Sequence, residues 1–258
     1  MNKQNNQAHI ISTSAGKGGV GKSLLSVNLA EMLVTMGYRV ALIDADLGLS
    51  NCAMLLNESV PGTAQDVVTE KVSINDIMHV TDSGLILVTG SETANYKNDH
   101  IYPVLDSVIM RLRYQCDFII IDTPAGVTEM NLWALDRSDL SLLILVNEPT
   151  VISDVYRFCK FIMEIDPSYP FATVVNFAID QDDAEKVAKR FNSITSHFLN
   201  REFPHLGHLP LDDKIRKSVM HQKPFVHVNE HGELLTRLRT ISDSLISHLK
   251  NIIINQTS

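Results

Sequence analysis

The architecture of this chain is set by one short segment, Gly16-Lys17-Gly18-Gly19-Val20-Gly21-Lys22-Ser23. It matches the pattern G-x-x-x-x-G-K-[ST], and it lies between an apolar run at 10–14 and an amphipathic segment that starts at Leu24. A strand before this motif and a helix after it are the context in which it binds phosphate. Glycines let successive N–H groups turn toward one point, and the positive end of the following helix adds to the attraction for anions. The segment therefore predicts a phosphate-binding loop, and it holds four of the chain's 12 glycines, which an ordinary turn would not need.

The two lysines of this loop are expected to have different tasks. Lys22 would reach the β- and γ-phosphates of a nucleotide, and the hydroxyl of Ser23 would bind Mg²⁺. Lys17 lies five residues earlier, and a second cation beside one site costs energy unless dense negative charge lies between the two. One lysine already serves the phosphates of a single chain. Lys17 is therefore either a solvated loop residue or a contact to a nucleotide that a symmetric partner binds.

Outward from the loop, short apolar runs alternate with amphipathic segments along the whole chain. Runs such as Phe118–Ile121 and Leu142–Val146 are apolar on both faces, which is typical of parallel strands covered on both sides. Strands are expected at Ile10–Ser14, Arg39–Ile43, Leu85–Thr89, Phe118–Asp122, Ser141–Val146, Phe171–Phe177 and Gly207–Leu209. Helices are expected at Leu24–Met36, Ile101–Arg113, Thr150–Ile165, Asp182–Leu199, Asp212–His221 and Glu233–Ile254. The pattern predicts an α/β fold with one doubly wound, mostly parallel sheet of about seven strands and helices on both faces.

Two local signals mark helix ends. Gly37 follows the first expected helix and is expected to be its C′ residue in the left-handed conformation. Ser73 followed by Asp76 resembles a capping arrangement, with Asp in place of the usual Glu or Gln.

Composition limits the class of protein. With 258 residues, 45% hydrophobic and 20% charged, the chain is expected to form one domain over 1–258, which includes a polar tail at 1–8. A net charge of −8 disfavours a protein that coats nucleic acid. The three cysteines Cys52, Cys116 and Cys159 include no CxxC pair, so neither a zinc site nor a bridging iron–sulfur cluster has a local signature. No apolar run is long enough to span a bilayer, and the protein is expected in the cytoplasm.

Two aspartate clusters follow predicted strands. Asp44-Ala45-Asp46 ends the strand at 39–43, and Asp122 ends the strand at 118–121. Ligands bind beyond the carboxyl ends of parallel strands, so both clusters are expected at the nucleotide. Asp122 would hold Mg²⁺ through water, and either Asp44 or Asp46 would orient the attacking water. Strand-end aspartates are also common caps and turn formers, which is the alternative for each cluster.

The spacing of Lys17 and Lys22 resembles the deviant Walker A motif of the MinD/ParA family of dimerising ATPases. Asp44–Asn51 and Asp122–Val127 look like the switch I and switch II segments of the MinD-type subgroup. The segments Asn147–Asp154 and Leu209–Val219 are most similar to the FlhG (FleN) branch, which regulates flagellar number and placement.

The resemblance implies an ATP-dependent homodimer in which two chains enclose two nucleotides. Lys17 would contact phosphate bound by the partner, and Asp46 would position the hydrolytic water. The expected catalytic residues are Lys17, Lys22 and Asp46. The expected ATP/ADP-binding residues are Gly16, Lys17, Gly18, Gly19, Val20, Gly21, Lys22, Ser23 and Leu24, with adenine contacts from Asn176, Pro210, Leu211 and Asp212. The expected Mg²⁺ ligands are Ser23, Asp46 and Asp122. Asn176 as a plain turn residue is the alternative for that position.

The same resemblance implies a slow ATPase switch that controls flagella at the cell pole. The partners it implies are a flagellar transcription activator, an FlhF-type GTPase or a component of the flagellar basal body. FlhG proteins usually carry an amino-terminal Asp-Gln-Ala motif that stimulates that GTPase, but here only Asn6-Gln7-Ala8 precedes the first strand. Stimulation of such a GTPase is therefore not expected of this chain.

The last expected helix has two interpretations. Leu234, Leu238, Ile241, Leu245 and Leu249 form a stripe at helical spacing, together with Leu235 and Ile253. By position, the helix at 233–254 matches the final core helix that packs on the sheet. Members of the family often attach to the inner membrane by a short terminal helix. If the helix of this chain did so, each copy would bind the membrane weakly, and stable attachment would need the two helices of a dimer.

The same sequence motifs also occur in proteins with other functions. A ParA-like DNA-partitioning ATPase would need a basic dimer face, and the chain offers only scattered pairs such as Arg216 and Lys217. No specific nucleic acid is therefore expected. A MinD-like ATPase that positions the division site, and a regulator that acts by binding alone, fit the same motifs. A cluster-carrier ATPase fits poorly, because the paired cysteines that it requires are missing.

Overall fold

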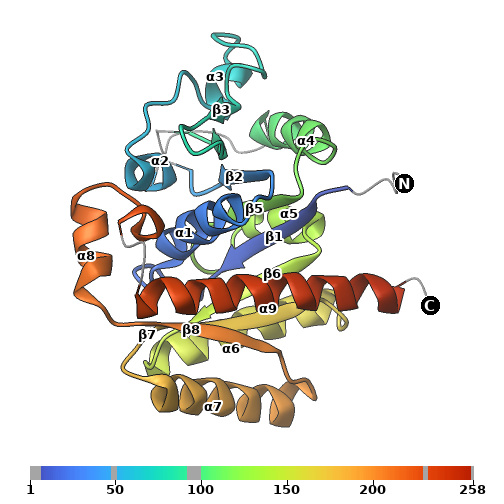
Figure 1. Ribbon diagram of the computed structural model, residues 1–258. Coiled ribbons are helices and arrows are strands. Elements are labelled where there is room, and N and C mark those ends of the chain that lie inside the picture. Colours follow the sequence, from blue (N-terminus) through green and yellow to red (C-terminus); the bar gives the residue numbers. More distant parts are fainter. Residues whose placement is uncertain (1–6, 48–50, 92–99, 229–231, 257–258) are drawn as a thin grey trace.

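The computed structural model describes residues 7–47, 51–91, 100–228 and 232–256 (Figure 1). Three parts of the expectations lie outside the described residues. These are positions 1–6 of the polar tail with Asn6, positions 48–50 of the switch I segment, and the side chains of Ile253 and Ile254.

One eight-stranded sheet runs through the described chain in the order β3-β4-β2-β5-β1-β6-β7-β8. Neighbouring strands are parallel except β3 and β4, which are antiparallel. The strands are β1 (His9–Ser14), β2 (Val40–Asp44), β3 (His79–Val80), β4 (Ile86–Thr89), β5 (Phe118–Asp122), β6 (Leu140–Leu145), β7 (Phe171–Ala178) and β8 (His205–Pro210). The predicted fold class is confirmed, with eight strands instead of about seven. The additional strand, β3, has only two residues, which is too short for the alternation of apolar and polar residues that indicates a strand.

The helices that connect the strands agree with the expected segments to within two residues at each end. They are α1 (Lys22–Thr35), α4 (Ile101–Leu112), α6 (Pro149–Ile165), α7 (Gln181–Leu199), α8 (Asp213–Met220) and α9 (Glu233–Gln256). Four further elements were not expected: α2 (Asn51–Leu56), α3 (Ala64–Val68), α5 (Glu129–Arg137) and the 3₁₀ turn η2 (Phe225–His227). These elements have three to nine residues, so they are too short to show helical periodicity.

The two capping expectations have different outcomes. Gly37 has φ 90° and follows α1, its N–H donates to the Val34 carbonyl at 2.8 Å, and the Tyr38 N–H donates to the Leu33 carbonyl at 3.1 Å. This is the pattern that ends a helix in a left-handed glycine, as expected. At Ser73, the backbone N–H donates to the Asp76 carboxylate at 2.8 Å, but the chain forms a turn there and no helix follows.

Apolar side chains pack on both faces of the sheet. On one face, residues of α4 and α5 such as Leu105 and Met130 pack against Ile43 and Ile121. A larger core joins α1, α6, α7 and α9 to the rest of the sheet. In Figure 1, α9 crosses the front of the sheet beside α1, whereas α4 and α5 lie behind it. The strands are therefore covered on both sides, which explains their uninterrupted apolar runs.

Helix α9 is part of the core. Five residues of its apolar stripe are at most 2% exposed: Leu234, Leu238, Ile241, Leu245 and Leu249. Gly207 of β8 lets the helix come close, because a Cβ at that position would lie 2.9 Å from Cγ1 of Ile241. Of the two interpretations of this helix, packing on the sheet is the one that the structure shows. Among the described residues, no helix is long and apolar enough to cross a membrane.

Candidate functional site

The site is a cavity of about 1150 Å³ at the carboxyl ends of β1 and β2, where the loop between β1 and α1 meets α2 and α8. Of the expected site residues, those that line it are Lys17, Gly18, Gly19, Val20, Gly21, Lys22, Ser23, Leu24, Asp46, Leu211 and Asp212. Gly16, Asp122, Asn176 and Pro210 are not among the lining residues of the described chain. The structure thus brings most of the expected set to one cavity, whereas Asp122 and Asn176 are buried and Gly16 and Pro210 are half-buried outside its lining.

The loop needs its glycines for different reasons. Gly19 and Gly21 have φ 82°, a conformation that residues with a Cβ rarely adopt. At Gly21 a Cβ would also lie 2.3 Å from Nδ2 of Asn176. At Gly18, by contrast, a Cβ would meet nothing within 4 Å. Packing within the described chain therefore does not require glycine at position 18, and this open space would let a phosphate come close to the backbone.

Behind the loop, Lys22 and Asp122 form a buried ion pair. Lys22 Nζ donates to Asp122 Oδ1 at 2.8 Å, and the side chains are 8% and 0% exposed. The same oxygen accepts hydrogen bonds from Ser26 at 2.8 Å and from Thr13 at 3.1 Å. Burial alone would lower the pKa of Lys22, but the charge of Asp122 and the hydrogen bond to it outweigh burial and raise that pKa. Lys22 therefore stays a cation.

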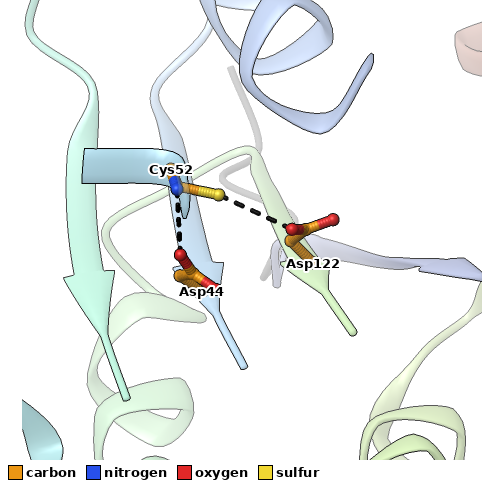
Figure 2. A group of neighbouring side chains, drawn as sticks. All are labelled: Asp44, Cys52 and Asp122. Carbon is orange, nitrogen blue, oxygen red and sulfur yellow. Dashed lines mark hydrogen bonds between the residues drawn. The ribbon is translucent and has the colours of Figure 1, made fainter. Parts of the chain in front are cut away.

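The two aspartates of β2 are separated by the structure into different roles. Both carboxylate oxygens of Asp44 accept backbone N–H groups, Oδ1 from Asp46 at 3.1 Å and Oδ2 from Cys52 at 2.9 Å (Figure 2). Asp44 is buried, and these two hydrogen bonds hold the backbone at Asp46 and at Cys52. Asp46 lines the cavity instead, and burial raises its pKa despite the opposing charge of Lys22. A carboxylate in the cavity with a raised pKa suits contact with a water molecule or a cation.

Cys52 lies between the two strand-end aspartates (Figure 2). Its side chain is fully buried, and its thiol donates to Asp122 Oδ2 at 3.7 Å. Burial, with the charges of Asp44 and Asp122, raises the pKa of the thiol well above its ordinary value. The thiol is therefore protonated and acts as a hydrogen-bond donor.

Lys17 is turned away from the ion pair of Lys22. Its Nζ donates to Glu148 Oε2 at 2.6 Å and to Thr150 Oγ1 at 3.3 Å, both next to the start of α6. The Lys17 and Glu148 side chains are 39% and 58% exposed. The two lysines of the loop therefore have separate carboxylate partners, one at the surface and one in the core.

The expected adenine contacts lie partly behind the cavity wall. Asn176 is 1% exposed; its Nδ2 donates to the Val20 carbonyl at 2.8 Å, and its Oδ1 accepts the Phe177 N–H at 3.0 Å. Its amide therefore supports the loop here, and a direct contact to adenine stays a prediction. The wall beside it is formed by Phe177, together with Leu211 and Asp212 at the start of α8.

The residues present fit Mg²⁺. This ion prefers oxygen ligands and keeps several waters, and the hydroxyl of Ser23 and the carboxylate of Asp46 both border the cavity. Asp122 lies directly behind them, which is compatible with the predicted contact through water. When bound, the ion would neutralise phosphate charge.

Sequence reasoning missed several residues that hold the site together, namely Thr13, Ser26, Cys52, Glu148 and Phe177. Ser26 follows Lys22 by one helical turn, so the period of α1 could have placed it beside Asp122. Asn131 was also missed. Its Nδ2 donates to Thr123 Oγ1 at 2.8 Å and to the Pro124 carbonyl at 2.9 Å, which fixes the turn after β5. No local signal marks Cys52 or Glu148, because their partners lie 70 and 131 residues away.

Comparison with protein families gives one match that covers most of the chain. The family model described as "ParA: NUBPL iron-transfer P-loop NTPase" matches residues 6–246. This range contains every residue that lines the cavity.

Individual relatives and solved structures were also compared. The chain is 29% identical over 217 residues to the antiactivator FleN of Pseudomonas aeruginosa, covering 83% of this chain and 78% of that protein. It is 25% identical over 246 residues to the flagellum site-determining protein YlxH of Helicobacter pylori, covering 93% and 82% respectively. The structure of the septum site-determining protein MinD of Pyrococcus horikoshii, complexed with Mg-ADP, has a TM-score of 0.74 and 22% identity over 92% of this chain and 96% of that one. The last comparison shows a shared fold.

Proposed function

This chain belongs to the ParA family of P-loop NTPases, and from that premise we propose that it is an ATPase switch that dimerises when ATP is bound. ATP would bring two chains together across the loop at 16–23, and hydrolysis would separate them. The output that we propose is control of flagellar number or placement. Similarity to FleN and YlxH supports this output.

The observation that carries the proposal is the separation of the two loop lysines. Lys22 is held by buried Asp122, whereas Lys17 is held at the surface by Glu148. A lysine needed only by the chain's own nucleotide would be expected in the interior beside Lys22. A lysine at the rim, bound to an exposed carboxylate, can exchange that partner for a phosphate that another chain carries.

The chain's own residues supply the remaining tasks. The loop N–H groups and Lys22 bind the phosphates, and Ser23, Asp46 and Asp122 supply the oxygens for Mg²⁺. Asp46 orients the attacking water. We place this activity in the cytoplasm. Attachment to the inner membrane through α9 is not part of the proposal, because the apolar stripe of that helix is buried.

Phosphate release from ATP, measured over a range of protein concentrations, tests the proposal. Turnover per chain should rise with concentration, since only the dimer is active. Lys17→Ala should keep most of the nucleotide affinity, measured by calorimetry, and lose at least about tenfold in turnover. The loss should stay below the ~10³–10⁵ that an arginine finger supplies, because lysine offers a point charge without a planar fork.

Turnover that is independent of concentration and unchanged in Lys17→Ala would contradict the dimer. A wild-type chain that binds neither ADP nor ATP would contradict the nucleotide site itself.

A further inference from the structure

The start of α2 is attached to two strands of the sheet through a single residue. The Cys52 N–H donates to Asp44 at the end of β2, and the Cys52 thiol donates to Asp122 at the end of β5 (Figure 2). Asp44 and Asp122 are neighbours in the register of these strands. Cys52 therefore lies above a pair of adjacent carboxylates and holds one with its backbone and the other with its side chain.

The two oxygens of Asp122 have different partners. Oδ1 accepts from Lys22, Ser26 and Thr13, whereas Oδ2, within the part of the chain that the structure describes, accepts from the thiol of Cys52. A change in the charge or position of Asp122 therefore changes its hydrogen bond with the Cys52 thiol. Other residues of α2 border the candidate site, because Asn51, Met54 and Leu55 line the cavity.

We propose that Cys52 is a positioning residue that couples the occupancy of the nucleotide site to the placement of α2. The proposal rests on the nucleotide binding proposed above. When Lys22 turns from Asp122 to a phosphate, the carboxylate loses its charged donor. A water held by Mg²⁺ would then take the place of Lys22 at Oδ1, while the thiol stays the donor to Oδ2. Without the direct ammonium contact, the thiol carries more of the charge of Asp122 in a low-dielectric interior, so its hydrogen bond strengthens and α2 is held more firmly.

Removal of the thiol leaves α2 attached by the Cys52 backbone N–H alone. Cys52→Val fills the buried position with a slightly larger apolar side chain that has no donor, whereas Cys52→Ser keeps a donor. Cys116→Val is the matched control, because Cys116 is also buried but precedes β5, at the opposite edge of the sheet from Asp122.

The test is hydrogen–deuterium exchange of the amides at 51–56, with and without ADP and Mg²⁺. In the wild type and in Cys116→Val, ligand should slow exchange in α2 by about tenfold, the scale of a hydrogen bond to a charged group. Cys52→Val should lose this slowing, and Cys52→Ser should recover most of it. A purely structural role of the thiol would instead raise exchange equally with and without ligand.

The coupling is refuted if Cys52→Val shows the wild-type slowing, or if Cys52→Ser behaves like Cys52→Val. Should Cys52→Val not fold, Cys52→Ala replaces it in the same comparison. Calorimetry with ADP and Mg²⁺ on the wild type distinguishes a failure of nucleotide binding from a failure of the role of Cys52. No heat of binding would contradict the proposed function, whereas binding with unchanged coupling in Cys52→Val would contradict only the role of Cys52.

Discussion

Lys17 and Lys22, two identical side chains on one loop, have carboxylate partners in different surroundings. Lys22 is buried against Asp122, where separating the pair without a ligand to replace either partner would leave a charge in the core. Lys17 is bound to Glu148 at the surface, where ion pairs contribute little. Lys17 is therefore the more easily released of the two, and in the proposed dimer the strength of its attachment to Glu148 would set how readily it contacts another chain.

Glu148→Gln should promote ATP-dependent dimerisation, because it weakens the attachment of Lys17 in the single chain. Exposed pairs contribute about 0.2–1 kcal/mol, so the dimer dissociation constant should fall by no more than about fivefold. Sedimentation of the chain with ATP measures this constant. Glu185→Gln, which breaks the exposed pair with Lys189 on α7, is the control and should change nothing. Weaker dimerisation of Glu148→Gln would show that Glu148 belongs to the interface instead.

Asp44 predicts a pH dependence of stability. Burial, followed by the charge of Asp122, raises the pKa of Asp44 to about 7. The unfolded chain loses this proton near pH ~4, so between about pH 4 and 7 the folded chain binds a proton that the unfolded chain has released. The contribution of this group to stability therefore falls as the pH rises through that window.

Asp44→Asn cannot titrate, so its urea midpoint should fall less than that of the wild type between about pH 5 and 8. Asp82→Asn, at an exposed position, should follow the wild type. Parallel midpoints of Asp44→Asn and wild type across the range would show that Asp44 has no raised pKa.

At the scale of elements, the long apolar strands and amphipathic helices could be predicted from the sequence, and the short elements could not. The strand Phe118–Asp122 is confirmed at both ends. Its sequence is a run of four apolar residues followed by an aspartate, and all five residues are buried. Helix α2 has six residues of which only Cys52 and Ala53 are buried, so it shows no period. The phosphate loop is a local motif, but Asn176 reaches Val20 across 156 residues, and only the strand order brings them together.

Helix α9 should behave as a core element. Leu238 is fully buried against the sheet, so Leu238→Ala should lower the free energy of unfolding by about 2–5 kcal/mol. Thr240→Ala, on the exposed side of the same helix, should change it by less than about 0.5 kcal/mol. Urea denaturation measures both. Equal, small effects would show that α9 is not anchored to the core.

At the scale of the whole molecule, the wall of the candidate site is built from distant parts of the described chain, with loop 16–23, α2 and α8 around it. Such a wall can respond to a ligand as a unit, because buried pairs behind it connect the loop to β5 and α2 to β2. In the proposed function, a change at the phosphates would reach the rim, where Lys17 lies, and nucleotide occupancy would control the association of chains.

The mass of the protein in solution with ADP and with ATP, measured by light scattering, tests this account most directly. The wild type should have the mass of one chain with ADP and of two chains with ATP. Asp46→Ala should remain at two chains, since it binds ATP but does not position the water, and Lys17→Ala should remain at one. A single-chain mass of the wild type and of Asp46→Ala with ATP, or a Lys17→Ala variant that doubles its mass as Asp46→Ala does, would contradict the claim that Lys17 serves a second chain.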